Sequence, residues 1–183
     1  MSPRPAPDRT ARRAQITHLT RQVAEAEGWA AVTMRRLAGE LGVTQPVLYS
    51  AFTSRQDLVD AVALDGFTAL SAALEAAPAT PPARMGAYLD FAVAHPRTYE
   101  AMFSLPSQLR FGDSTHAPLG RAFTAIREAF PTTGDDGADD VRAEVAWSTL
   151  HGLATLQAGG RLPAGRTRAR LEAAQRMLTP GTT

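Results

Sequence analysis

The stretch from Thr33 to Phe52 constrains the fold more than any other part of the chain, because it places a sharp turn between two short amphipathic segments. Three apolar residues of the first segment share one helix face, namely Leu37, Ala38 and Leu41. Gly42 follows them, and glycine tolerates the left-handed backbone that ends a helix. The sequence therefore predicts a helix that begins after Thr33, a suitable N-cap, and stops at Gly42.

The second segment has the start signals of another helix. Thr44 is the predicted N-cap, and Pro46 lies in the first turn, where a missing amide hydrogen costs little. Its predicted apolar anchors are Val47, Leu48 and Phe52, and its outward polar side chains are Gln45, Tyr49 and Ser50. Two helices joined in this way form a helix-turn-helix, and its second helix is the element that enters the major groove of DNA.

The rest of the chain predicts more helices and contains no strand signal or internal repeat. Apolar periodicity and breakers place them at about residues 8–27, 54–77, 83–94, 98–103, 118–130, 139–158 and 164–178, with irregular structure at 105–117 and a polar loop at 131–140. Ser54 and Asp57 have the spacing of a capping box at the start of the long helix. The predicted fold is all-α, with about nine helices in two domains. Residues 1–53 form a three-helix helix-turn-helix head with a disordered N-terminal arm, and residues 54–183 form an antiparallel helical bundle.

Charge is distributed unevenly between these parts. The net charge is +1, yet residues 1–56 hold eight arginines against four acidic residues. A basic head suits a polyanionic partner, although an ordinary fluctuation of surface charge explains the same excess. The chain has no cysteine, no apolar run long enough for a membrane span and no signal-peptide core, so we expect a cytoplasmic protein that makes no membrane contact.

The residues of the predicted helix-turn-helix resemble the DNA-binding domain of TetR-family transcriptional regulators. The matching elements lie within about residues 10–60 and are Leu37-Ala38, Gly42-Val43-Thr44, Leu48-Tyr49, Phe52, Ser54-Arg55 and Leu58. The family commonly has His or Tyr where this chain has Ala51, so one phosphate contact is missing here, and often Lys where Arg55 keeps the charge. The resemblance implies double-stranded DNA as a partner.

A second resemblance covers the C-terminal part. Trp147, His151 and Gly152, together with the run from His95 to Phe103, resemble the TetR-family ligand-binding domain named for its Trp-His-Gly motif. Trp147 is either a core residue or a pocket wall, and His151 is either a satisfied buried histidine or the polar group of a pocket. The predicted lining of an effector pocket is Tyr88, Phe91, Phe103, Phe123, Trp147 and His151.

The helix at about 139–158 is apolar on more than one side, so it needs two neighbours. Its own bundle supplies one, and either the bundle or a second copy of the chain supplies the other. In TetR-family proteins the last two helices form the dimer interface, so the resemblance implies a homodimer. The expected interface residues are Val145, Gly152, Leu153, Leu156, Leu171 and Leu178.

Catalytic and metal-binding readings find little support in the sequence. The four histidines, His18, His95, His116 and His151, stand in no zinc-protease or serine-hydrolase context. The acidic cluster Asp135, Asp136, Asp139 and Asp140 lacks the ligand spacing of an EF-hand, and aspartates suit the start of a helix. We therefore expect no enzyme activity, no metal and no cofactor.

These features predict a TetR-like regulator, in particular a repressor that binds a palindromic operator as a dimer and leaves it when a small apolar or aromatic ligand binds. The expected DNA contacts are Thr33, Arg35, Arg36, Tyr49 and Arg55 for phosphates and Gln45 with Pro46 or Val47 for bases, while Thr44 serves as both a cap and a contact. Packing against Leu48 and the first helix is the alternative for Tyr49. The alternative function is a small-molecule-binding or scaffold protein whose helix-turn-helix is structural. The operator, the effector, the regulated genes and the choice between repression and activation cannot be read from the residues.

Overall fold

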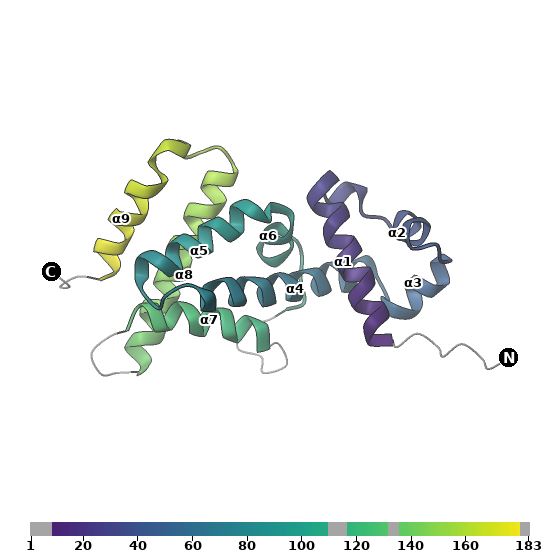
Figure 1. Ribbon diagram of the computed structural model, residues 1–183, viewed down its shortest axis with the longest axis horizontal. Coiled ribbons are helices and arrows are strands. Elements are labelled where there is room, and N and C mark those ends of the chain that lie inside the picture. The colour runs from purple at the N-terminus through teal and green to yellow at the C-terminus, as the bar shows by residue number, and fades with distance from the viewer. Residues whose placement is uncertain (1–8, 110–116, 132–135, 180–183) are drawn as a thin grey trace. The chain divides into compact units, whose positions relative to one another are not determined.

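The computed structural model describes residues 9–109, 117–131 and 136–179, and within these ranges all regular structure is helical. The all-α prediction is confirmed (Figure 1). The helices are α1 (Arg9–Glu27), η1 (Trp29–Ala31), α2 (Met34–Leu41), α3 (Gln45–Ala51), α4 (Arg55–Ala76), α5 (Pro81–Ala94), α6 (Pro96–Phe103), α7 (Ala117–Ala129), α8 (Asp136–Ala158), η2 (Ala164–Arg166) and α9 (Thr167–Leu178). The two elements labelled η are short 3₁₀ helices.

The chain divides into two compact units. The first consists of Met1–Gly66 and Arg97–Leu109, and the second consists of Phe67–Pro96 and Arg110–Thr183. Helices α4 and α6 each contribute residues to both units. These boundaries describe packing, so the functional boundary expected between residues 53 and 54 stays a prediction.

The core of the first unit comes from the apolar faces of its helices. The side chains of Ile16, Leu37, Leu48, Phe52 and Leu58 are all 0% exposed. Helix α1 packs against η1, α2 and α3, and α2 packs against α3. Burial of a large apolar side chain is worth about 1.5–3 kcal/mol, so this shared core holds together helices that are too short to be stable alone.

The start of α6 also packs in the first unit. The Glu25 carboxylate accepts hydrogen bonds from the amides of Arg97 (3.1 Å) and Thr98 (2.9 Å) and from the Thr98 hydroxyl (2.6 Å). A carboxylate is favourable at a helix N-terminus, where amides have no partner within the helix. Trp29 Nε1 donates to the Arg97 carbonyl at 2.9 Å. A Cβ atom at Gly66 would lie 2.7 Å from side-chain atoms of Thr98 and Met102, so α4 and α6 approach closely there.

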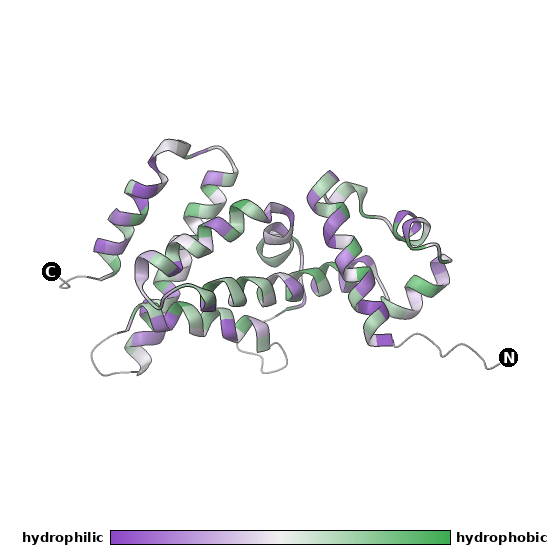
Figure 2. Ribbon diagram, viewed as in Figure 1, coloured by the Kyte–Doolittle hydropathy of each residue, from purple (hydrophilic) through white to green (hydrophobic). Residues whose placement is uncertain are grey.

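In the second unit, α8 packs against α5, α7 and α9, and α5 also packs against α7 and α9. Figure 2 shows α4 largely in the colour of hydrophobic residues, and Phe67, Leu70 and Leu74 at its C-terminal end are at most 1% exposed. The one buried cation in the described part of this unit is Arg84, which is 5% exposed. Its guanidinium donates to the carbonyls of Ala125 (3.2 Å) and Pro78 (3.4 Å), so its burial is compensated.

Several predicted boundaries need correction. Helix α8 begins at Asp136, three residues earlier than predicted, so the polar loop is shorter; Asp139 and Asp140 lie in the first two turns, where they oppose the helix dipole. Helices α5 and α6 begin at Pro81 and Pro96, because proline fits the first turn of a helix and its missing amide needs no partner there. The N-terminal arm at 1–8, His116 and Asp135 lie outside the described residues.

Candidate nucleic-acid interface

The turn between α2 and α3 has the predicted geometry. Thr33 is the N-cap of α2, and its hydroxyl accepts from the Arg36 amide at 3.2 Å. Gly42 has φ 63° and ψ 31°, the left-handed conformation that glycine adopts without a Cβ penalty. The Val43 amide bonds to the Ala38 carbonyl at 3.0 Å, which closes the end of α2. Thr44 occupies the N-cap position of α3, but its side chain makes no capping hydrogen bond.

Helix α3 has a buried side and an exposed side. Leu48 and Ala51 are 0% and 5% exposed. The opposite side carries four side chains of the predicted DNA-contacting set that are exposed, namely Gln45, Pro46, Val47 and Tyr49. Val47, expected to serve both as an anchor and as a base contact, is 37% exposed. It is therefore not a core anchor, because the shared core uses Leu48, Ala51 and Phe52 instead.

Two arginines of α1 hold the C-terminal end of α3. Arg9 Nη2 donates to the Ser50 carbonyl at 3.2 Å, and the Arg13 guanidinium donates to the Ala51 carbonyl. These carbonyls are among those that a helix leaves without an internal partner, and cations favour this end of the helix dipole. The Arg13 guanidinium also lies 4.0 Å from the centre of the Phe52 ring. Helix α1 thus fixes the position of α3 through its C-terminal carbonyls and leaves the exposed side chains of α3 uncovered.

Arg9 and Arg13 were not among the functional residues predicted from the sequence. Their four-residue spacing puts both on one face of α1, which was the available signal. Their partners lie 41 and 38 residues away, however, and no local pattern identifies a bond over that separation.

Asp57 joins α1 to the start of α4. Its carboxylate accepts from Arg13 Nη2 at 3.1 Å and from the Thr53 amide at 3.0 Å, while its own amide donates to Ser54 Oγ at 3.1 Å. The reciprocal bond of the predicted capping box therefore goes to Thr53, not to Ser54. Partial burial acts to raise the pKa of Asp57, but the hydrogen bonds from Arg13 and Thr53 outweigh it and hold the pKa below its ordinary value.

The three arginines expected to contact phosphates differ in how far they are already engaged. Arg36 pairs with both oxygens of Glu27 and with Glu40 (Nε to Oε1, 3.0 Å), and its hydrogen bond lowers the pKa of Glu27. Arg55 Nη2 donates to the Trp29 carbonyl at 3.0 Å. Arg35 is exposed and makes no ion pair with any residue that the structure describes. Arg35 is therefore the most available of the three for a phosphate.

Trp147 contacts two of the other expected pocket residues, Tyr88 and Phe123. In the second unit, Trp147 Nε1 donates to the hydroxyl of the fully buried Tyr88 at 3.1 Å, and the ring of Phe123 lies 6.1 Å from that of Trp147. Phe91 contacts His95 edge-on, with the two ring centroids 5.0 Å apart. Phe103 belongs to the first unit, where it lies 4.7 Å from the ring of Tyr99.

His151 is half-buried on α8, one turn after Trp147. Burial lowers its pKa below the ordinary value of 6.5, so the neutral imidazole is favoured. A neutral half-buried histidine suits both alternatives left open by the sequence, and its role as a pocket residue stays a prediction.

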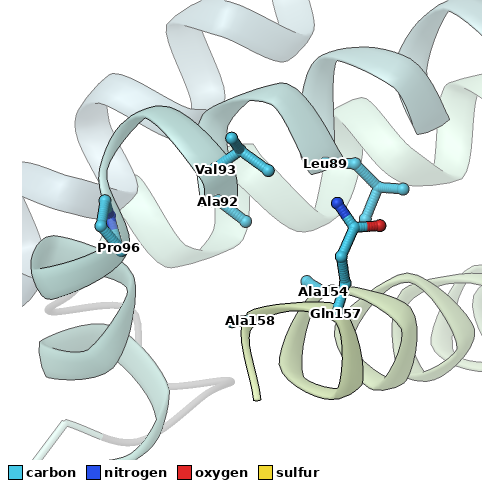
Figure 3. Close-up of a pocket in the computed structure, with 7 residues that line it drawn as sticks. All are labelled: Leu89, Ala92, Val93, Pro96, Ala154, Gln157 and Ala158. Atoms are coloured by element: carbon cyan, nitrogen blue, oxygen red, sulfur yellow. The ribbon is translucent and has the colours of Figure 1, made fainter. Parts of the chain in front are cut away.

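A cavity of about 310 Å³ lies in the second unit, between the C-terminal turns of α5 and α8. Its seven lining residues are Leu89, Ala92, Val93, Pro96, Ala154, Gln157 and Ala158 (Figure 3). None of them belongs to the set expected from the sequence, which came from the apolar faces of the predicted helices. Small side chains at Ala92, Ala154 and Ala158 create the space. A cavity that results from small side chains produces no apolar pattern in the sequence.

Helix α8 exposes apolar side chains along one stripe. Val141, Val145 and Leu156 are 60%, 51% and 40% exposed. Of the remaining residues expected at a chain–chain interface, Gly152, Leu153 and Leu171 are half-buried, whereas Leu178 packs in the core of its own unit. Within the described residues, no helix is long and apolar enough to cross a membrane, and no group of histidine and acidic side chains could hold a metal ion.

Comparisons with known proteins agree with this architecture. Residues 16–62 match the family described as bacterial regulatory proteins, tetR family, and residues 82–179 match the family described as tetracyclin repressor-like, C-terminal domain. An uncharacterised HTH-type transcriptional regulator of Mycobacterium tuberculosis is 32% identical over 141 residues. That match covers 73% of this chain and 64% of the relative, which is less than two thirds of its length.

Solved structures show the same fold. A Rhodococcus sp. RHA1 protein of unknown function is 29% identical, with a TM-score of 0.69 and 97% of each chain covered. A TetR transcriptional regulator from the same organism is 18% identical, with a TM-score of 0.68 over 95% of this chain and 98% of that one. BioQ, solved with its double-stranded DNA operator, is 21% identical, with a TM-score of 0.60 over 91% and 96%. With both parts of the chain matched, the helix-turn-helix described above is that of a TetR-family transcriptional regulator, and the chain belongs to this family.

Proposed function

We propose that the first unit binds double-stranded DNA by placing α3 in the major groove. The observation that carries this proposal is the division of α3 into a buried side and an exposed side. Leu48 is 0% exposed, whereas Tyr49 is 49% exposed and Val47 37%. The buried side and the two α1 arginines fix the helix, so its exposed side chains are presented in a defined orientation. A structural neighbour of the same fold, BioQ, is known with its DNA operator, which is consistent with this use of the fold.

The proposed base contacts come from the N-terminal half of α3. The Gln45 carboxamide has the donor and acceptor pair that recognises an adenine edge, and Pro46 or Val47 can contact a thymine methyl group. Thr44 is available as a further contact because its hydroxyl does not cap α3. Base contacts carry the sequence preference, whereas phosphate contacts only set the register.

The proposed phosphate contacts surround these residues. Arg35 is the principal one, because its guanidinium has no ion-pair partner among the described residues. Thr33 and Tyr49 contribute hydroxyl groups at the same surface. Arg36 and Arg55 contribute less unless they exchange their present partners, Glu27 and the Trp29 carbonyl, for phosphate oxygens.

We further propose that two copies of the chain act together. The stripe of Val141, Val145, Gly152 and Leu156 on α8 provides an apolar surface, and the half-buried Leu153 and Leu171 extend the expected interface. A symmetric dimer would bind an operator whose half-sites are related by the same two-fold axis, about 34–36 Å apart. Burying apolar side chains that are half exposed in the single chain supplies the driving force for association.

The proposed regulation is repression that a small apolar or aromatic effector relieves. An effector can bind the second unit more tightly when the DNA-binding units are in positions that do not fit the operator. By linkage, it then weakens DNA binding by the same factor by which DNA weakens effector binding. The residues predicted from the sequence to contact the effector are the aromatic residues and His151 described above. Helix α4 is the proposed lever, because its residues belong to both compact units.

Binding-site selection from random double-stranded DNA tests the proposal. The expected product is a palindrome with half-sites about one helical turn apart, bound by a species of twice the 19.5 kDa chain mass in light scattering. Recovery of no enriched sequence, with binding that is equal for all DNA and vanishes at moderate salt, would contradict sequence-specific recognition. A strict monomer bound to a single half-site would contradict only the dimer.

A further inference from the structure

The cavity between α5 and α8, called here the α5–α8 groove, has the character of a small-molecule site. Its volume of about 310 Å³ lies within the range of ligand pockets. Six of its seven lining residues are apolar, and none carries an ionisable side chain. Gln157 is the single polar side chain, and Figure 3 shows its carboxamide between the two helices.

A chain of hydrogen bonds fixes the orientation of the Gln157 carboxamide. Arg170 Nη1 is anchored on the Pro163 carbonyl at 3.0 Å, and its Nη2 donates to Thr167 Oγ1 at 3.3 Å. Thr167 Oγ1 in turn donates to Gln157 Oε1 at 3.0 Å. Since the hydroxyl accepts from a guanidinium, its own proton is directed to the amide oxygen. The carboxamide oxygen is therefore in use, and Nε2 has no acceptor among the residues that the structure describes.

We propose that the α5–α8 groove binds a neutral, largely apolar small molecule whose one hydrogen-bond acceptor, such as a ketone or ester carbonyl, accepts from Gln157 Nε2. An apolar ligand without an acceptor would bury this donor unsatisfied, which is unfavourable. A carboxylate would lose its hydration with no cation in the groove to compensate. The role of this molecule as the effector rests on the proposed function, but its binding does not.

The chain itself connects the groove to the DNA-binding unit. Pro96 lines the groove, and the next residue, Arg97, binds the first unit through its amide to Glu25 and through its carbonyl to Trp29. The Trp29 carbonyl also accepts from Arg55. A ligand that displaces Pro96 therefore acts, across one peptide bond, on the contacts that hold α1 and η1. Differential binding to the two arrangements gives the coupling that induction requires.

A second copy of the chain is the alternative occupant, and the geometry of α8 disfavours it. At 3.6 residues per turn, Val145 and Leu156 point about 180° and about 200° away from Ala154 around the helix axis. The exposed apolar stripe proposed for dimerisation thus lies on the side of α8 opposite the groove. A continuous chain–chain interface would not include both surfaces.

Two probes of matched shape test the inference on the full-length chain. Benzophenone has two apolar rings, one ketone oxygen and a photochemical reaction with nearby C–H bonds, whereas diphenylmethane has the same rings without the acceptor. We expect benzophenone to bind at least about tenfold more tightly, which corresponds to about 1.4 kcal/mol for one hydrogen bond. After irradiation, mass spectrometry should locate the label on peptides of α5 and α8 that contain Val93 and Ala158.

Variants test whether Gln157 Nε2 causes the preference for benzophenone over diphenylmethane. Gln157→Leu should bring the affinity ratio of the two probes to one or below, because the ketone oxygen then has no donor in the groove. Gln175→Leu, a matched amide removal on α9 outside the groove lining, should leave the ratio unchanged. Because the ratio is measured within one protein, loss of stability does not mimic the effect. Should Gln157→Leu fail to fold, Thr167→Val keeps the amide but releases its orientation, and the ratio should fall partway.

An equal affinity of the wild-type chain for both probes, or labelling centred on Tyr88, Phe123 and Trp147, would overturn the inference. Ala158→Phe, a change at an exposed lining residue, should block benzophenone and leave the oligomeric state unchanged. Conversion of a dimer to a monomer by this change would show that the groove belongs to a chain–chain interface and would also overturn it.

Mobility shift with the selected operator separates this inference from the proposed function. If the chain binds the operator but does not bind benzophenone, the proposed ligand site in the groove is wrong and the DNA-binding proposal is unaffected. Gln157-dependent benzophenone binding by a chain that selects no operator would refute the proposed function and support the site. If both hold, saturating benzophenone should weaken operator binding in the wild type and not in Gln157→Leu.

Discussion

The two compact units expose opposite kinds of surface. In the first, the large apolar side chains of α3 are buried except for Val47, and the exposed side of α3 carries an amide, a phenol and a hydroxyl at Gln45, Tyr49 and Ser50. In the second, α8 leaves Val141, Val145 and Leu156 at least 40% exposed. Polar groups on a fixed helix suit base edges and phosphates, whereas exposed apolar groups suit a partner chain or an apolar ligand.

The difference extends to how each surface is supported. Helix α3 has seven residues, too few for stability alone. It depends on the burial of its own Leu48 and on the hydrogen bonds from Arg9 and Arg13 of α1 to its last carbonyls. Helix α8 has 23 residues and packs against three other helices. We therefore expect the recognition surface to be sensitive to changes far from DNA, and the surfaces of the second unit to respond mainly to changes within them.

The largest expected effect comes from removing the anchor of α3. Leu48→Ala should destabilise the protein by about 2–5 kcal/mol, because it empties part of a fully buried site, and operator binding should be lost with the orientation of α3. Chemical denaturation monitored by circular dichroism measures the first effect. Val47→Ala, one residue earlier on the exposed side, is the matched control and should change stability by no more than about 0.5 kcal/mol.

A smaller effect separates the two kinds of DNA contact. Gln45→Ala should lower affinity by about 1–3 kcal/mol for the preferred base at one operator position and leave other sequences almost unaffected. Arg35→Ala should weaken binding to all sequences alike and reduce the salt dependence by about one phosphate contact. Fluorescence anisotropy with operator and scrambled DNA at two salt concentrations measures both. Wild-type discrimination by Gln45→Ala would show that this amide reads no base.

Support from α1 should contribute less. Arg13→Met keeps an apolar stem near Phe52 but removes the hydrogen bonds to Ala51 and Asp57. We expect the free energy of unfolding to fall by only about 1 kcal/mol, because the side chain is partly exposed and solvent screens its charge. Arg12→Met on the same helix should be close to neutral. If Arg13→Met lowered operator affinity no more than Arg12→Met, α1 would not position α3 as described.

The smallest expected effect is a difference in pH dependence between the units. The folded pKa of His151 is lowered, so its protonation favours the unfolded chain and should reduce stability as pH falls from about 6.5 towards the folded pKa. The pKa of Asp57 is also lowered, but its stabilisation should disappear only below its ordinary value of 3.8. Thermal melting between pH 7.5 and 5 should show the first loss in the wild type, and a smaller loss in His151→Gln.

Local sequence was sufficient where the structure is local. The cap at Thr33, the left-handed Gly42 and the buried Leu48 of α3 each follow from residues within one or two turns of each other, and these were predictable. The predicted anchor Val47 was wrong, because it is 37% exposed and Ala51 is buried in its place. The all-α fold follows in the same way from helical periodicity and from Pro and Gly at the helix ends. Beginnings such as Asp136 and Pro81 were misplaced because the first turn of a helix shows no periodicity.

Long-range contacts were not predictable. Nothing near Glu25 indicates that it caps a helix 72 residues later, and the α5–α8 groove depends on small side chains from two helices that the sequence separates by about 60 residues. The hydrogen bond from Trp147 Nε1 to the Tyr88 hydroxyl joins residues 59 positions apart, and no local pattern indicates it. Cavities are set by what is missing between helices, which a single sequence does not display.

The absence of cysteine from the chain allows one measurement that addresses the central claim directly. A single thiol introduced by Val47→Cys can be tested for disulfide cross-linking to a thiol-tethered base in the major groove of the selected operator, with Met177→Cys, exposed on α9, as the control. We expect efficient cross-linking for Val47→Cys at one position in each half-site and none for Met177→Cys. Cross-linking of Met177→Cys with no reaction of Val47→Cys at any base would contradict it.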